Sequence, residues 1–98
     1  MKTQTKERAQ IIYLMLEEIS LKKNASKEQL NRLTEIAQLL KEDVEIGEKT
    51  SGVLDDISEF GEKALKLSSE KEMNDFLKQE DRKIEEYYEH FKMLFKEE

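Results

Sequence analysis

The residue best placed for chemistry is the single histidine of the sequence, His90, which follows Glu86 by four positions. On a helix this spacing puts both side chains on one face, where they could bind one metal ion together. The metal sites of helical bundles instead carry Glu and His three residues apart on two helices, with further carboxylates from the other helices. The sequence therefore favours an ordinary surface or flanking histidine and predicts no metal site and no cofactor.

Four pairs of adjacent acidic residues could suggest general acid–base catalysis. They are Glu17-Glu18, Asp55-Asp56, Glu80-Asp81 and Glu85-Glu86. Neighbouring residues on a helix point about 100° apart, so the two carboxylates of one pair do not converge on a substrate. We interpret these pairs as solvated helix faces.

Nucleophilic and nucleotide-dependent catalysis also lack their usual residues. The sequence has no cysteine, and with one histidine its serines form no convincing catalytic triad. The three glycines, Gly47, Gly52 and Gly61, match neither spacing of the phosphate-binding loops. These observations predict a protein that is not an enzyme.

The charge distribution argues against nucleic acid as a partner, because the formal net charge is −6 and no basic stripe is present. Residues 1–24 carry five positive and three negative side chains, and residues 70–98 carry six positive and ten negative ones. The longest apolar run, Ile11 to Leu16, is six residues, far short of the roughly 20 that cross a bilayer. We expect a cytoplasmic protein whose contact with a membrane is at most peripheral.

Apolar residues recur at helical spacing along the sequence, which predicts one all-α domain over residues 1–98. The clearest stripe has spacings of 3, 4, 3 and 4 and consists of Leu30, Leu33, Ala37, Leu40 and Val44. Similar stripes predict a first helix from Thr5 to Lys22, ending near Asn24, and a third helix whose apolar face extends from Val53 to Leu67. One helix cannot bury such a stripe alone, so the helices must pack together.

Capping signals place the ends of these helices. Ser26 with Gln29, and Ser69 with Glu72, are spaced as capping boxes that begin the second and fourth helices. The second helix is expected to end at Ile46-Gly47, and Thr50 or Ser51 to cap the third. Gly61 is expected to allow close approach of a neighbouring helix.

The fourth helix has no breaker before the end of the sequence and is expected to overhang or to bend within Lys78 to Lys83, its one stretch without an apolar residue. The predicted architecture is an antiparallel up-down-up-down four-helix bundle with a long C-terminal helix. Four aromatic residues crowd that helix: Tyr87, Tyr88, Phe91 and Phe95. Such a stripe is more often core than a binding surface, although an overhang would leave part of it available to a partner.

Three segments, read in order, carry a family resemblance: residues 16–20 (LEEIS), residues 33–42 (LTEIAQLLKE), and Gly47 followed by residues 53–57 (VLDDI). In helix order, loop placement and apolar spacing over about Ile12 to Leu67 they resemble the enterocin A type of immunity proteins. These proteins protect the producers of pediocin-like (class IIa) bacteriocins. The proline that several members carry in the second inter-helix loop, and their C-terminal extension, have no counterpart here.

This resemblance implies a cytosolic antiparallel four-helix bundle without enzymatic activity. It implies action at the inner face of the membrane on the mannose phosphotransferase permease when a bacteriocin has bound it. The C-terminal half of such proteins decides which bacteriocin is countered, so the expected partner-binding residues are Tyr87, Tyr88, Phe91 and Phe95. We expect a monomer or weak dimer. The alternative is a small soluble regulatory or scaffold bundle that binds a protein partner with the same stripe.

Overall fold

The structure is a computed structural model that describes residues 3–43 and 46–96, with side chains through Leu94. Five helices occupy these residues: α1 (Thr3–Lys22), α2 (Lys27–Lys41), α3 (Glu48–Leu65), α4 (Glu70–Gln79) and α5 (Asp81–Lys96). No strand occurs in the described residues, so the predicted all-α class is confirmed for them. The helix count differs from the expected four because the C-terminal segment forms two helices.

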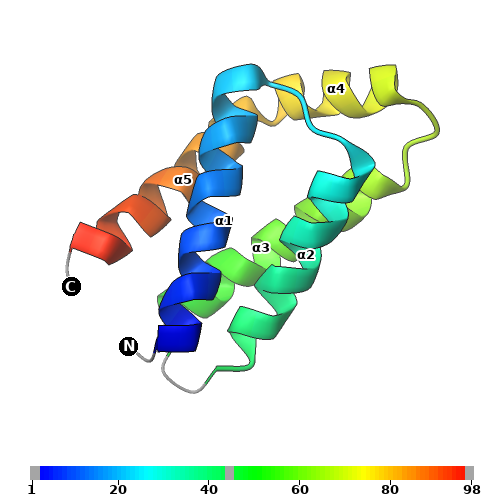
Figure 1. Ribbon diagram of the computed structural model, residues 1–98. Helices are drawn as coiled ribbons and strands as arrows, with labels where there is room; N and C mark the ends of the chain where they lie inside the picture. The colour runs from blue at the N-terminus through cyan, green and yellow to red at the C-terminus, as the bar shows by residue number, and fades with distance from the viewer. Residues whose placement is uncertain (1–2, 44–45, 97–98) are drawn as a thin grey trace.

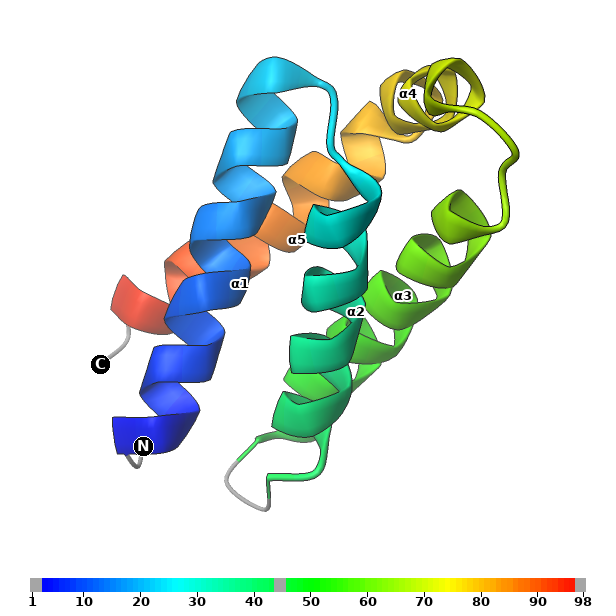
Figure 2. The ribbon, with the colours of Figure 1, turned by 45° about the vertical axis from the view of Figure 1, so that its right-hand side comes forward.

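The first three helices lie beside one another and alternate in direction (Figure 1). α2 contacts both α1 and α3, and α5 crosses α1 and also contacts α3. Figure 2 shows α4 beyond the end of α3, turned away from the direction of the other helices. α4 contacts α3 and α5, so the C-terminal pair of helices is joined to the rest mainly through α1 and α3.

The core consists of the apolar faces of all five helices. The predicted stripe of the second helix is confirmed where the structure describes it, since Leu30, Leu33, Ala37 and Leu40 are fully buried. Its fifth member, Val44, lies outside the described residues. The other fully buried large side chains are Ile12, Leu16, Ile19, Leu54, Ile57, Met73, Leu77, Ile84 and Phe91. Each helix thus supplies at least two side chains to one continuous core.

The connection between α1 and α2 begins at Lys23, one residue before the predicted stop at Asn24. Lys23 has φ 55°, a left-handed conformation that ends the helix, and its N–H donates to the Ile19 carbonyl at 2.7 Å. The capping box at Ser26 is confirmed. Gln29 N–H donates to Ser26 Oγ at 3.1 Å, and Ser26 N–H donates to Gln29 Oε1 at 2.9 Å.

The predicted end of the second helix was wrong. α2 ends at Lys41, and Gly47 has φ −72° and is the N-cap of α3 instead of the end of α2. The hydroxyl of Thr5, which is 1% exposed, donates to the Asp43 carboxylate just beyond the end of α2. A buried hydroxyl needs such a partner, and leaving the helix allows Asp43 to supply it.

The predicted N-cap of the third helix was also wrong, since neither Thr50 nor Ser51 caps it. Thr50 lies inside the first turn of α3, where it is 7% exposed, and its hydroxyl oxygen is 2.9 Å from Nε2 of His90. A partner on α5 therefore replaces the expected local bond. Capping signals within one segment cannot reveal such a competitor from a distant helix.

Gly61 permits the close packing of α3 against α2 that the sequence predicted. A Cβ atom at this position would overlap the hydroxyl oxygen of Thr34, which donates to the Leu30 carbonyl at 2.8 Å. Thr34 is itself buried. The absence of a side chain at residue 61 therefore sets the distance between these two helices.

The C-terminal segment bends inside the predicted stretch from Lys78 to Lys83. α4 ends at Gln79, Glu80 caps it with φ −96° and ψ 14°, and α5 begins at Asp81. At the start of α4, Ser69 accepts from Glu72 N–H at 3.2 Å, whereas the Glu72 carboxylate accepts from Ser68 Oγ instead of completing the expected box. The break at Glu80 aims α4 and α5 in different directions and places a pocket between them and α3.

Candidate functional site

The aromatic stripe of α5 lies mainly in the core. Phe91 is fully buried and Tyr87 is 8% exposed, whereas Tyr88 is only half-buried. Phe95 belongs to α5, but its side chain lies outside the described residues. In this arrangement Phe91 lies in the core, and Tyr88 is the most exposed of the three side chains of the stripe that the structure describes.

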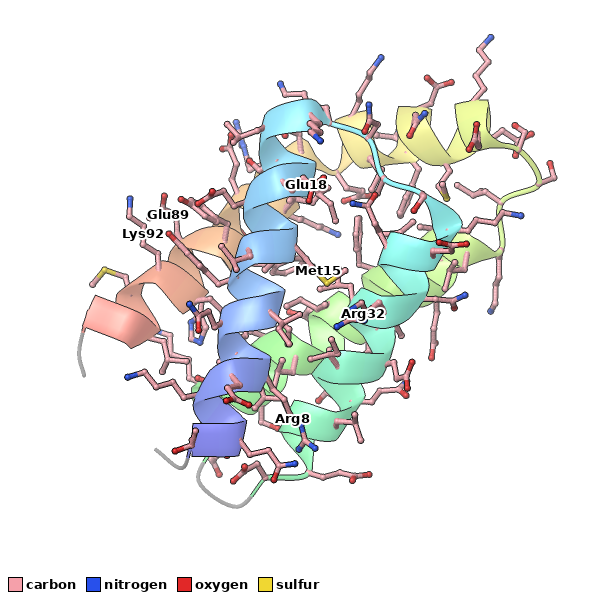
Figure 3. The ribbon with its side chains drawn as sticks, viewed as in Figure 1. Arg8, Met15, Glu18, Arg32, Glu89 and Lys92 are labelled. Atoms are coloured by element: carbon pink, nitrogen blue, oxygen red, sulfur yellow. The ribbon has the colours of Figure 1, made fainter. Side chains whose placement is uncertain are left out.

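Tyr88 faces α1, where it meets another tyrosine. The rings of Tyr88 and Tyr13 are stacked with centroids 5.2 Å apart and planes 12° from parallel, and their hydroxyl oxygens are 3.5 Å apart. The Tyr88 hydroxyl also donates to Glu17 Oε2 at 3.3 Å. Lys92, seen with Glu89 on α5 in Figure 3, has its Nζ 6.0 Å from the centroid of the Tyr88 ring.

The surroundings of Tyr88 favour its neutral form. Its hydrogen bond with Tyr13, its partial burial and the negative charge of Glu17 together raise the pKa of the Tyr88 hydroxyl above the ordinary tyrosine value. The Tyr88 hydroxyl therefore stays protonated at neutral pH. The stacking of Tyr88 on Tyr13 joins α5 to α1.

A second feature lies on the opposite flank of α5, where α3, α4 and α5 meet around a cavity of about 190 Å³. Its aromatic wall consists of Phe60, Phe76 and Tyr87. The Phe60 and Phe76 rings are stacked with centroids 5.5 Å apart, and Phe60 meets Tyr87 edge-on at 6.4 Å. We call this cavity the acidic aromatic pocket, because carboxylates form most of the rest of its lining.

The charged lining of the acidic aromatic pocket contains four acidic and two basic residues. The acidic residues are Asp56, Glu59, Glu80 and Glu86, and the basic ones are Lys63 and Lys83. Lys83 Nζ lies 3.4 Å from Glu80 Oε2, so this lysine neutralises a carboxylate of its own site. The lining as a whole keeps an excess of negative charge.

The pKa of Tyr87 is affected by its position in this pocket. Burial raises the pKa of Tyr87 to about 12, and the negative charges of Asp56, Glu80, Glu86 and Glu59 add to that effect. The same field that disfavours a phenolate at this position favours a positive charge nearby.

The pocket revises the interpretation of the acidic pairs as solvated faces only. Three of the four pairs each contribute one carboxylate to it, namely Asp56, Glu80 and Glu86. Adjacent carboxylates do point apart, as predicted, but tertiary packing brings members of different pairs to one cavity. The usable signal in the sequence was the spacing on α3, because residues 56, 59, 60 and 63 share one face.

His90 lies on α5 at a different place from the acidic aromatic pocket. It contacts Thr50 through Nε2 and meets the neighbouring Phe91 ring edge-on at 5.5 Å. Among the described residues there is no group of three or more His, Asp or Glu side chains that could hold a metal ion. The pairing with Thr50 connects the first turn of α3 to α5.

The remaining surface carries isolated apolar side chains. Leu14 and Leu21 on α1 are 52% and 78% exposed, and Met93 on α5 is 50% exposed. Met15 projects from α1 toward α2 in Figure 3 and is half-buried. Within the described residues, no helix is both long enough and apolar enough to span a membrane.

Comparison with protein-family models, with curated proteins and with solved structures finds no match to this chain.

Proposed function

We propose that this chain is a bacteriocin immunity protein, which protects the producing cell from a pediocin-like bacteriocin without catalysing a reaction. The observation that supports the proposal is that the residues carrying the resemblance occupy buried positions in three consecutive helices. These residues are Leu16 and Ile19 in α1, Leu33, Ala37 and Leu40 in α2, and Leu54 and Ile57 in α3. Buried positions define how helices pack, so a shared pattern of this kind favours a shared architecture.

On this proposal, α4 and α5 together represent the fourth element of an antiparallel four-helix bundle, interrupted at Glu80. Recognition belongs to this C-terminal half. Its accessible features are the open side of Tyr88 and the acidic aromatic pocket. Amphipathic aromatic side chains with one exposed edge are common anchors in protein interfaces.

The proposed partner is the mannose phosphotransferase permease with a bound bacteriocin, reached from the cytoplasmic side. Leu14 and Leu21, which are seven residues apart on one face of α1, suit a peripheral contact with the membrane beside that partner. The protein itself is proposed to act as a monomer or weak dimer.

The test is to express the chain in a sensitive strain and challenge the cells with a panel of pediocin-like bacteriocins. We expect protection against at least one of them. Tyr88→Ala should reduce protection more than its melting temperature would explain, and Tyr88→Phe, which keeps the ring, should retain most protection. Full sensitivity to the whole panel, in cells that contain the folded protein, would contradict the proposal.

A second candidate is a regulatory or scaffold bundle that binds another protein. The acidic aromatic pocket is equally compatible with it, since such a pocket suits a protein partner whatever the partner's role. The two candidates differ in genomic setting, because an immunity gene is expected beside the gene of a small bacteriocin precursor.

A further inference from the structure

We infer that the acidic aromatic pocket binds a lysine or arginine side chain from a basic segment of a protein partner. This inference rests on the proposed function for the identity of that partner. The chemistry of the pocket is independent of it and follows from three properties of the pocket: its size, its charge and its aromatic wall.

The size of the pocket selects a single side chain over a small-molecule ligand. Pockets that enclose metabolites and cofactors usually have volumes of about 300 to 1,000 Å³. The acidic aromatic pocket is smaller, at about 190 Å³. It can admit one long side chain while the rest of the partner remains outside.

The charge of the pocket selects a cation. Among the described residues, Asp56, Glu59 and Glu86 form no ion pair within 4.0 Å, whereas Glu80 already pairs with Lys83. These three residues line the cavity, are exposed to solvent and have no counter-charge within ion-pair distance in the described part of the chain. Their combined field also contributes to the raised pKa of Tyr87.

The arrangement of the carboxylates favours an organic cation over a metal ion. They come from α3 and α5 on different sides of the cavity and do not converge as a group that could hold a metal. The space between them is walled by Phe60, Phe76 and Tyr87. Aromatic faces attract ammonium and guanidinium groups and also cover the apolar stem of Lys or Arg.

Binding is tested on the purified chain by titration with short blocked peptides, followed through the amide NMR signals of residues 60, 76 and 87. The probe is acetyl-Gly-Gly-Lys-Gly-Gly-amide, and its control contains norleucine, which keeps the carbon chain without the charge. We expect saturable shifts with the lysine peptide, at a dissociation constant on the order of 1 mM, and none with the control. No saturable shift with lysine, or equal shifts with norleucine, would overturn the inference.

Variants with a matched control locate the site. Glu59→Gln with Glu86→Gln removes two carboxylates of the pocket, and affinity should fall about fivefold or more. Glu62→Gln with Glu85→Gln changes the same two helices and the same net charge outside the pocket, so affinity should stay within about twofold of the wild type. Equal weakening by both pairs, at unchanged melting temperatures, would show a diffuse charge effect and overturn the site.

The same variants separate this inference from the proposed function. If the wild type binds the lysine peptide in the pocket but protects no strain, the function fails and the pocket assignment stands. If the wild type protects and the peptide does not bind, the pocket assignment fails and the function stands. Loss of protection in the Glu59→Gln, Glu86→Gln variant alone would support both.

Discussion

At the scale of single residues, the aromatic side chains of α5 divide by the flank on which they lie. Tyr88 faces α1 and Tyr87 faces α3, with the fully buried Phe91 between them. The sequence predicted that these residues share a helix stripe, and it named Phe91 among the expected partner-binding residues, but the Phe91 side chain is fully buried. The sequence could not predict which side of α5 packs against which helix, because Tyr13 of α1 and Phe60 of α3 reach the stripe only through tertiary packing.

Gly61 provides the sharpest test of packing at this scale. Gly61→Ala places a methyl group against the buried Thr34 hydroxyl and should lower the free energy of unfolding by about 1 to 3 kcal/mol. Gly52→Ala is the matched control in the same helix, since nothing beyond its chain neighbours and the backbone of its own helix lies within 4 Å of the added Cβ, and it should stabilise by about 0.5 to 1 kcal/mol. Chemical denaturation measures both, and a neutral Gly61→Ala would mean that α2 and α3 are not in close contact there.

Tyr87 predicts a dependence of stability on alkaline pH. Its pKa is raised to about 12 in the folded chain, so the unfolded chain loses this proton first as pH increases. The contribution to stability is complete below pH about 10 and is lost as pH rises toward 12.

The measurement is the free energy of unfolding of wild type and Tyr87→Phe across this range. The variant should lose less stability than the wild type between pH 10 and 12, because it has no proton to release at residue 87. Parallel curves would show that folding does not raise the pKa of Tyr87.

At the scale of helices, the sequence was most informative where a signal is local. The stripe of α2 and the capping box at Ser26 were predicted correctly, because both depend on residues three or four positions apart. The end of α2 and the start of α3 were not. Both are set by bonds to other helices, from Thr5 to Asp43 and from Thr50 to His90.

The buried stripe of α2 can be tested by two adjacent leucines. Leu40 is fully buried and Leu40→Ala should cost about 2 to 5 kcal/mol, whereas Leu39 is 41% exposed and Leu39→Ala should cost less than about 0.5 kcal/mol. Thermal or denaturant unfolding of the two variants distinguishes them. A large cost at residue 39 and a small one at residue 40 would mean that α2 presents its other face to the core.

At the scale of the whole molecule, the described residues form a body of 38 × 22 × 19 Å in which side chains from all five helices share one core. The acidic aromatic pocket belongs to this scale, because its lining comes from three helices and from Glu80 between two of them. Three of its four carboxylates, all but Glu59, could be found in the sequence as members of separate acidic pairs. Their meeting could not, since it depends on the angle between α4 and α5.

The shared core predicts a single cooperative unfolding transition. Helix content can be followed by circular dichroism, and the surroundings of Tyr13, Tyr87 and Tyr88 can be followed by tyrosine fluorescence. Both signals should change at the same temperature. Phe91→Ala should lower that temperature in both signals by the same amount, with a cost of about 3 to 5 kcal/mol. Two separate transitions would show that α4 and α5 unfold independently of the first three helices.

The one-residue junction at Glu80 also limits how the length of this chain can change. Connections between helices usually accept inserted residues, because nothing downstream depends on their length. Here α4 ends at Gln79 and α5 begins at Asp81, so an insertion that continues either helix rotates all that follows by about 100°. Such a rotation would carry Ile84 and Phe91 out of the core and turn Glu86 away from α3. Glu80 can therefore be substituted more readily than residues can be added or removed beside it.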